Sequence, residues 1–168
     1  RLVSSAASDV YKRQVLMSSP EYFKVEYSIN PWMVPGTNVD LELAKNQWNG
    51  LKRTIEEAGA EVKVVPPSEN HPDLVFTANS GIIRGNDVLI ANFKFEERRG
   101  EEEIYIKWFK ENEYNVSRIP PDYKFEGRGD AFVYGDYLVG SYGVRSDKEA
   151  LLYICLLYTS DAADDTNR

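Results

Sequence analysis

Cysteine and histidine are nearly absent from this sequence, whose 168 residues include only Cys155 and His71. A single cysteine excludes an internal disulfide, and one cysteine with one histidine leaves too few ligands for a zinc cluster. Long apolar runs are absent too, and none approaches the roughly 20 residues of a membrane-spanning helix. We therefore expect no metal site and no membrane partner.

Positive charge is in deficit, with 20 Lys and Arg against 27 Asp and Glu and a net charge of -7. A chain of that charge repels nucleic acid in general, so we expect no nucleic-acid partner. The composition, 42% hydrophobic and 28% charged, is near the globular average. It predicts an acidic, mixed globular protein and says nothing more about function.

The two ends of the chain are related to each other at the level of DNA. Residues 4–14 read SSAASDVYKRQ and residues 155–164 read CLLYTSDAAD. One back-translation of the first, read on the opposite strand, encodes the second. We interpret residues 1–14 and 155–168 as foreign, translated from one element that looks like a sequencing-library adapter. Residues 15–154 are then the authentic segment, an N-terminal fragment of a longer protein, and they keep the net charge of -7.

Apolar periodicity within that segment predicts strands and helices in alternation. Residues 18–35 are rich in proline and aromatic side chains and disfavour regular structure. The order fits a simple doubly wound parallel sheet poorly, because strands also occur in adjacent pairs. We predict an α/β protein with helices at 40–58, 101–112 and from 148, and strands at 15–17, 61–65, 74–76, 81–84, 88–91, 114–119, 131–134 and 137–141.

Polar side chains recur where predicted strands meet loops, and they include Asp73, Asn79, Glu126 and Asp130. Carboxylates that converge on one cavity suit a planar cation such as a guanidinium, because each oxygen accepts a charge-assisted hydrogen bond. The alternative is that these residues only form turns, which is common for Asp and for a Glu-Gly-Arg-Gly-Asp segment.

Five motifs in order carry a family resemblance. They are Asn-Pro-Trp-Met at 30–33, Pro-Asp-Leu-Val-Phe-Thr-Ala-Asn at 72–79, Arg-Arg-Gly-Glu-Glu at 98–102, Phe-Glu-Gly-Arg-Gly-Asp at 125–130 and Gly-Val-Arg at 143–145. Together they resemble the guanidino-group-modifying superfamily of dimethylarginine dimethylaminohydrolases, arginine deiminases, arginine dihydrolases and amidinotransferases. The resemblance spans residues 15–154. It implies a five-bladed α/β propeller (pentein-like) of strand-helix-strand units, incomplete in this chain.

The resemblance also implies roles for residues around the guanidino group. Asp73 would hold the substrate guanidinium, and Glu126 would do the same or orient a catalytic imidazole. Asn79 stands where the dimethylarginine hydrolases have a carboxylate. An asparagine there resembles the dihydrolase branch, which releases two ammonia molecules from arginine to leave ornithine.

At the other end of the substrate, the resemblance implies that Arg98 and Arg145 hold the α-carboxylate. Asn30 would line the entry for substrate. The partner is thus a small arginine-like molecule, and the chemistry needs no metal or organic cofactor. We also expect a cytoplasmic protein, with homo-oligomerisation of the parent left open.

The family reaction uses a cysteine nucleophile near the C-terminus and a histidine downstream of the Gly-Val-Arg motif. Neither position is matched here, because His71 precedes the motif and Cys155 lies in the segment interpreted as foreign. We therefore expect an inactive fragment of an arginine dihydrolase or deiminase. The alternatives are an amidinotransferase, a dimethylarginine dimethylaminohydrolase, a non-catalytic propeller binding module, or an acidic α/β domain whose carboxylates only form turns.

Overall fold

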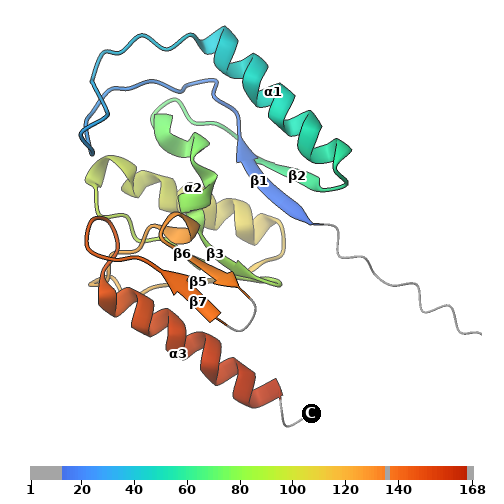
Figure 1. Cartoon of the computed structure of the whole chain (residues 1–168), viewed down its shortest axis with the longest axis vertical. Coiled ribbons are helices and arrows are strands. Elements are labelled where there is room, and N and C mark those ends of the chain that lie inside the picture. The colour runs from blue at the N-terminus through green and yellow to red at the C-terminus, as the bar shows by residue number, and fades with distance from the viewer. Residues whose placement is uncertain (1–12, 135–136, 166–168) are drawn as a thin grey trace, which may run out of the picture.

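The computed structural model describes residues 13–134 and 137–165 (Figure 1). Three short 3-10 helices, η1 (Pro72–Val75), η2 (Thr77–Ser80) and η3 (Gly127–Gly129), lie between the longer elements. The strands and α-helices, in chain order, are β1 (Gln14–Ser18), α1 (Leu41–Glu57), β2 (Glu61–Val65), β3 (Gly81–Arg84), β4 (Asp87–Ile90), α2 (Glu96–Glu111), β5 (Asn115–Arg118), β6 (Ala131–Tyr134), β7 (Tyr137–Gly140) and α3 (Lys148–Asp165).

The sheets repeat a strand-helix-strand unit. β1 pairs in parallel with β2 across α1, and β4 pairs in parallel with β5 across α2. β3 and β4 form an antiparallel hairpin, as do β6 and β7. The α/β class is therefore confirmed. Over the described residues the strands form three separate sheets of two, three and two strands, so a closed ring is not seen and the number of blades stays a prediction.

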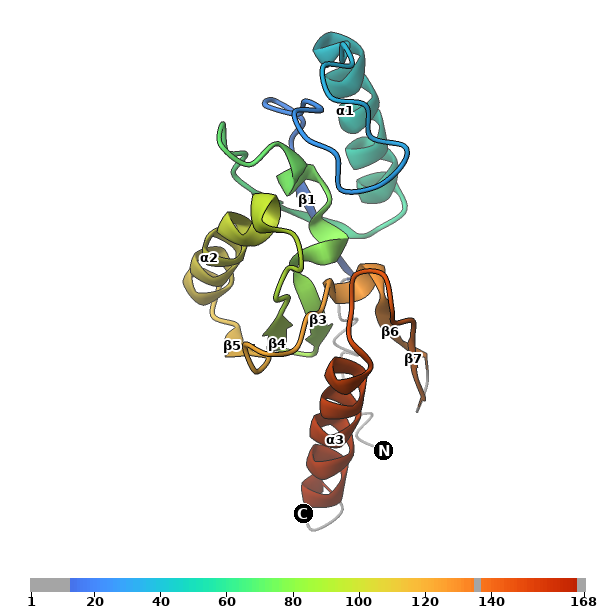
Figure 2. The same ribbon diagram turned by 90° about the vertical axis from the view of Figure 1, so that its left-hand side faces the viewer.

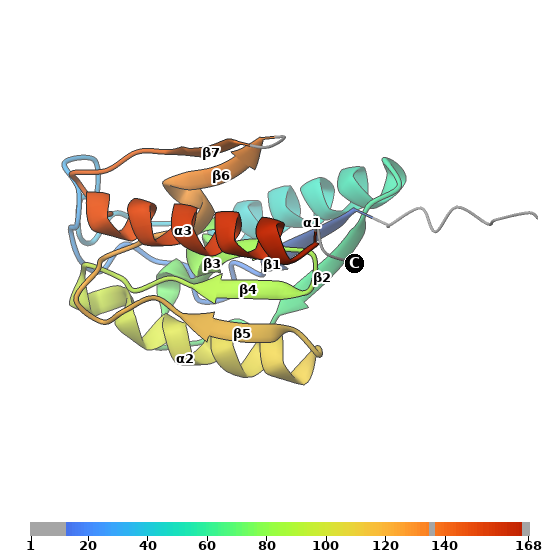
Figure 3. The ribbon, with the colours of Figure 1, turned by 90° about the horizontal axis from the view of Figure 1, so that it is seen from below.

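Alternating side chains of β4 supply both layers of the core. Val88 and Ile90 pack with Tyr105 and Phe109 of α2. Leu89, which points to the opposite face, packs in a second cluster with Ile154 of α3 and with neighbouring apolar residues. Figure 3 shows α2 and α3 on the two sides of the three-stranded sheet. The central sheet is thus the one that fixes both helices in place.

Helix α1 begins and ends where the sequence predicts. Asp40 caps its N-terminus, with Oδ1 accepting from the Leu43 amide at 2.9 Å. The helix ends before Gly59, whose φ of 87° is the left-handed value typical of a C-terminal glycine. None of its side chains is buried, and Leu51 on the predicted apolar face remains 55% exposed. Figure 2 shows α1 at one end of the molecule and α3 extending from the other.

The strand predicted at 74–76 is wrong. These residues belong to η1, where the Leu74 amide donates to the His71 carbonyl and the Phe76 amide to the Asp73 carbonyl. Pro72 at the first position favours such a turn because its φ is already fixed near the helical value. A short apolar run fits a buried 3-10 turn as well as a strand, which is why periodicity failed here.

Helix α2 begins five residues before the predicted start at 101. Gly100 lies inside the helix, where a Cβ atom would clash with Nε2 of His71. The glycine therefore accommodates the imidazole instead of ending the helix.

Helix α3 continues from Lys148 to Asp165 through the predicted junction at 155. Most of residues 1–14, which we interpret as foreign, and the terminal 166–168 lie outside the described residues. Within 13–134 and 137–165, no helix combines the length and apolar content needed to cross a membrane.

Candidate functional site

A cavity of about 400 Å³ brings together six sequence-predicted residues from distant parts of the chain. It lies between the irregular segment that precedes α1, the turns η1 and η2, the start of α2 and the loops on either side of β6 and β7. Its lining includes Asn30, Asp73, Asn79, Arg98, Glu126 and Arg145. The six residues therefore share one hollow, although their roles toward a substrate remain proposals.

Close packing between η2 and η3 positions two of these groups. The side-chain amide of Asn79 donates to the backbone carbonyl of Glu126 at 3.0 Å. Gly127 has a φ of 62°, and a Cβ atom there would lie 2.7 Å from the backbone nitrogen of Gly81. Only glycine permits both this backbone conformation and this approach. The Glu-Gly-Arg-Gly-Asp segment thus has a steric function beyond turn formation.

Arg98 is 3% exposed and is held by four hydrogen bonds. Its Nε and Nη2 donate to the two carboxylate oxygens of Glu101 at 2.8 and 2.7 Å. Nη2 also donates to the backbone carbonyl of Asp73 at 3.2 Å, and Nη1 donates to Oδ1 of Asn79 at 3.3 Å. Nη1 carries two N–H groups and makes this one hydrogen bond among the described residues. Arg98 therefore orients two polar residues of the cavity and retains one donor.

Burial and charge pairing oppose each other in the Arg98–Glu101 pair. Desolvation works against the charged guanidinium of Arg98, but the hydrogen-bonded Glu101 outweighs it and raises the pKa of Arg98. Desolvation raises the pKa of the Glu101 carboxyl, and Arg98 opposes that rise. The pair is bidentate and buried, so loss of either partner would leave an unpaired buried charge.

Glu126 presents a buried carboxylate without a donor. It is 0% exposed, and both carboxylate oxygens lack a hydrogen-bond partner among the described residues. Its ionic partner is Arg145, whose Nη1 lies 3.4 Å from Oε2. Desolvation raises the pKa of the Glu126 carboxyl, with Arg145 opposing it. A buried acceptor of this kind is incompletely satisfied and is suited to a cationic donor from a ligand.

Arg145 is held on the opposite side by Asp130. Its Nη2 donates to Oδ1 of Asp130, while Oδ2 of Asp130 accepts from the hydroxyl of Ser146 at 2.7 Å. The Ser146 hydroxyl in turn accepts from the Glu126 amide at 3.0 Å. The Arg145 side chain remains 35% exposed. It is thus anchored at one edge and accessible to a ligand at the other.

The segment before α1 supplies much of the apolar wall. Phe23 packs edge-to-face on Phe76, with ring centroids 5.8 Å apart. Asn30 uses its Oδ1 to accept from the amides of Trp32 and Met33 at 3.0 and 3.2 Å. Asn30 therefore stabilises the turn at the cavity as well as lining it.

His71 and Cys155 are not among the cavity-lining side chains that the structure describes. His71 lies at the start of η1, where Nδ1 is 2.9 Å from the Ser68 hydroxyl, and burial lowers its pKa. Cys155 is exposed on α3. Among residues 13–134 and 137–165, no group of three or more His, Cys, Asp or Glu side chains could hold a metal ion.

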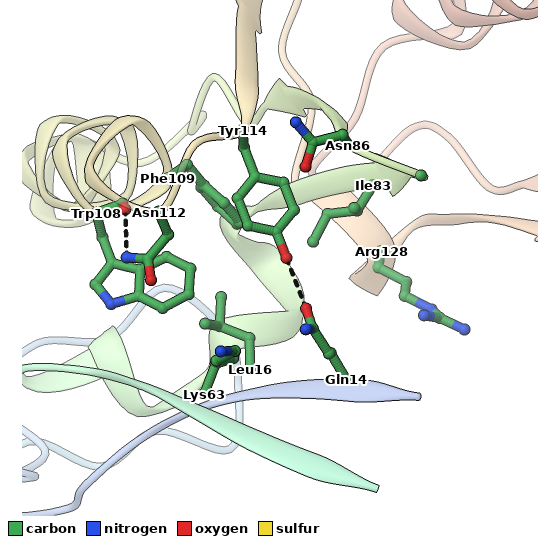
Figure 4. Close-up of a pocket in the computed structure, with 11 residues that line it drawn as sticks. Gln14, Leu16, Lys63, Ile83, Asn86, Trp108, Phe109, Asn112, Tyr114 and Arg128 are labelled. Carbon is green, nitrogen blue, oxygen red and sulfur yellow. Dashed lines mark hydrogen bonds between the residues drawn. The ribbon is translucent and has the colours of Figure 1, made fainter. Parts of the chain in front are cut away.

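A larger cavity, of about 630 Å³, lies elsewhere, between β1, β2, the β3–β4 turn and the end of α2 (Figure 4). There the Tyr114 hydroxyl donates to Oε1 of Gln14 at 2.8 Å. Lys63 is already paired with Glu61 at 2.8 Å. No buried charged group lines this cavity among the described residues, and Gln14 falls in the segment interpreted as foreign. The smaller cavity is therefore the better candidate.

Sequence reasoning missed two polar residues next to the site. Glu101 lies in the quoted Arg-Arg-Gly-Glu-Glu motif, but its pairing with Arg98 at i,i+3 requires a helix that begins before residue 98. Tyr27 lies in a segment without regular structure, where no periodicity indicates which side chains turn inward.

Comparison with known protein families shows which family this chain belongs to. The family model described as N,N dimethylarginine dimethylhydrolase, eukaryotic, matches residues 31–157. The chain belongs to this family. Five of the six predicted site residues lie within the matched range, and Asn30 lies just before it.

Two curated relatives extend the match over most of the chain. The uncharacterized protein ZK1307.1 of Caenorhabditis elegans is 43% identical over 162 residues, covering 94% of this chain and 56% of its own length. The bifunctional arginine dihydrolase/ornithine cyclodeaminase ArgZ of Synechocystis is 41% identical over 144 residues, covering 84% of this chain and 20% of ArgZ. The family member described here thus spans little more than half of one relative and a fifth of the other.

A solved structure confirms the fold. The N-terminal domain of ArgZ, crystallised as a cysteine-to-serine mutant bound to substrate, matches with a TM-score of 0.81 and 40% identity. The match covers 87% of this chain and 55% of that domain. The described elements therefore adopt the α/β arrangement of the corresponding part of the ArgZ domain.

Proposed function

We propose that this chain is the substrate-binding part of a hydrolase that acts on the guanidino group of arginine or a close relative. The observation that carries the proposal is the cavity that Asp73, Glu126 and Arg145 line together. The two carboxylates are buried, and the side chain of Arg145 is partly exposed. Family membership supports a guanidino hydrolase, because the family is named for an enzyme that acts on a substituted arginine.

The carboxylates suit the guanidinium end of such a substrate. Glu126 has two acceptor oxygens without donors among the described residues, and a guanidinium supplies N–H donors in the same plane. Fixed negative charge beside the guanidino carbon would keep the cation charged and hold it in line for attack. Metal and organic cofactors are not required by this chemistry.

The arginines suit the carboxylate end. Arg145 is partly exposed at the cavity, and Arg98 retains an N–H donor on Nη1. We propose that Arg145 contributes most to holding the α-carboxylate, while Arg98 adds one hydrogen bond and orients Asp73 and Asn79. Asn30 would limit the entrance through the turn that it caps.

Arginine dihydrolysis is the preferred reaction because the cavity contains an amide, Asn79, between Arg98 and Glu126. The 41% identity to the arginine dihydrolase ArgZ supports this choice. Hydrolysis of dimethylarginine is the second candidate, favoured by the matching family model. An amidinotransferase would need an acceptor amine in addition to arginine.

We further propose that the chain described here does not catalyse the reaction alone. The nucleophilic cysteine and the acid–base histidine would come from the part of the relatives' length that this chain does not span. In a five-bladed propeller those residues would be supplied by blades other than the ones described.

The test is to express the longer protein that contains residues 15–154 and to analyse its products from arginine and from dimethylarginine. Ornithine with two equivalents of ammonia from arginine would support dihydrolysis. Citrulline as the only product from arginine would reject it, and no turnover of either substrate would reject the hydrolase proposal.

A further inference from the structure

Ser146 lies where the two loops of the proposed site meet, residues 126–130 and 143–146, and its hydroxyl makes a hydrogen bond in each direction. The oxygen accepts from the backbone amide of Glu126 at 3.0 Å, and the hydroxyl donates to Oδ2 of Asp130 at 2.7 Å. Ser146 is 2% exposed, so both contacts are shielded from solvent. A side chain without a hydroxyl would therefore leave a buried amide and a carboxylate oxygen without this partner.

Backbone contacts on both sides of Ser146 fix its position against Glu126. The Asp147 amide donates to the carbonyl of Lys124 at 2.8 Å, and the Lys124 amide donates in return to Oδ2 of Asp147 at 2.7 Å. The carbonyl of Ser146 itself accepts from the Gly143 amide at 2.9 Å. The hydroxyl is therefore presented to Glu126 by a loop that is anchored before and after the serine.

The backbone of Glu126 is held at both of its peptide groups. Ser146 accepts from its amide, and the side-chain amide of Asn79 donates to its carbonyl at 3.0 Å. The carboxylate oxygens accept no hydrogen bond among the described residues. The two contacts thus fix the base of the Glu126 side chain and leave its oxygens available to a donor from a ligand.

Asp130 extends the connection from Ser146 to Arg145. Its Oδ1 accepts from Nη2 of Arg145, while its Oδ2 accepts from Ser146. Nη2 of Arg145 also donates to the carbonyl of Gly129 at 3.4 Å, and Nη1 lies 3.4 Å from Oε2 of Glu126. A closed ring of polar contacts results, made of Glu126, Ser146, Asp130 and Arg145. It joins the carboxylate proposed for the guanidinium to the arginine proposed for the α-carboxylate.

We infer that Ser146 and Asp130 are positioning residues that set the separation between the two ends of the substrate site, and with it the length of the arginine-like chain that fits. Neither is among the described side chains that line the cavity, and both act through Glu126 and Arg145. The inference rests on the proposed function for the identity of the ligand, whereas the ring does not depend on it. The alternative is that Ser146 only stabilises the packing of the two loops, in which case its loss would weaken ligands of every length by the same factor.

The test measures the binding of arginine and of homoarginine, whose side chain is one methylene longer, to the 168-residue chain by isothermal titration. Ser146→Ala removes the hydroxyl, and Ser141→Ala, at an exposed serine of the same connection between β7 and α3, is the matched control. We expect Ser146→Ala to weaken the preferred ligand by about tenfold and to bring the ratio of the two affinities toward one by at least about threefold. Ser141→Ala should leave both affinities in place. Partial unfolding would lower both apparent affinities equally and leave the ratio unchanged.

A ratio that Ser146→Ala leaves unchanged, or one that is close to one in the unmodified chain, would overturn the inference. Ser146→Cys keeps the size of the side chain with a weaker hydrogen-bonding group, so it must change the ratio in the same direction, and it decides the test if the alanine variant does not fold.

If neither ligand binds the unmodified chain, the proposed function is rejected, and NMR of the Arg145 side chain then tests the ring. Arg145→Lys assigns the resonances. Faster rotation of the Arg145 guanidinium in Ser146→Ala than in Ser141→Ala would support the positioning role of Ser146, and equal rates would overturn it.

Discussion

At the scale of single residues, the site is a set of buried charges with unequal compensation. Arg98 and Glu101 satisfy each other through two hydrogen bonds, whereas Glu126 has no donor among the described residues. Buried pairs are costly to break, and a buried carboxylate whose oxygens accept no hydrogen bond is suited to a cationic ligand. The Arg98–Glu101 pair therefore maintains the site, whereas Glu126 is available to bind a ligand.

We predict that Glu101→Gln destabilises the fold by about 3 kcal/mol, because it leaves the Arg98 guanidinium buried without its counter-charge. Glu97→Gln, an exposed position on the same helix, is the control. Urea unfolding gives the free energy of unfolding for each. Equal values for the two variants would show that the pair is not needed for stability.

His71 predicts a pH dependence of stability. Burial lowers its pKa in the folded chain below the ordinary value of 6.5, so the unfolded state binds more protons near pH 6. Its contribution to stability is therefore full above pH 6.5 and is lost as the pH falls below that value. We expect the free energy of unfolding to rise more between pH 5.5 and pH 7.5 in the unmodified chain than in His71→Asn. Parallel pH profiles would contradict the assignment.

At the scale of elements, the cavity depends on the approach of η2 to η3. Sequence patterns predicted most of the regular elements, since β2, β3 and β6 begin and end at the predicted residues. They failed at 74–76, where Pro72 begins a 3-10 turn, and at the start of α2, where Gly100 packs on His71. In both places local periodicity does not determine the structure. Glu101 and Tyr27 were missed for a related reason, because one depends on where α2 begins and the other lies in irregular structure.

We predict that Gly127→Ala lowers the free energy of unfolding by more than the strain of its left-handed backbone conformation alone. Gly85 has a similar φ, 57°, and no other group lies within 4 Å of the place a Cβ atom would occupy, so Gly85→Ala measures the conformational cost of about 1 kcal/mol. Gly127→Ala adds a clash with Gly81 and should cost about 1–3 kcal/mol more. Thermal and urea unfolding compare the two, and equal losses would show that η3 can move away without penalty.

At the scale of the whole molecule, apolar side chains remain exposed on the last elements. Tyr134 and Tyr137 are each 73% exposed on the β6–β7 hairpin, and Leu156 is 69% exposed on α3. Exposed apolar strands in a two-stranded sheet favour association with another chain. We expect sedimentation velocity to show concentration-dependent self-association, reduced in Tyr137→Lys. A monomer at all concentrations would contradict this expectation.

The central claim is that the cavity recognises the positive charge of a guanidino group through buried carboxylates. Arginine and citrulline are nearly the same size, but only arginine is cationic at the side-chain end. Isothermal titration of the 168-residue chain with both ligands, repeated with Asp73→Asn, tests the claim. We predict that arginine binds at least about tenfold more tightly than citrulline, as charge-assisted hydrogen bonds require, and that Asp73→Asn removes most of the difference. Equal affinity for the two ligands in the unmodified chain would contradict it.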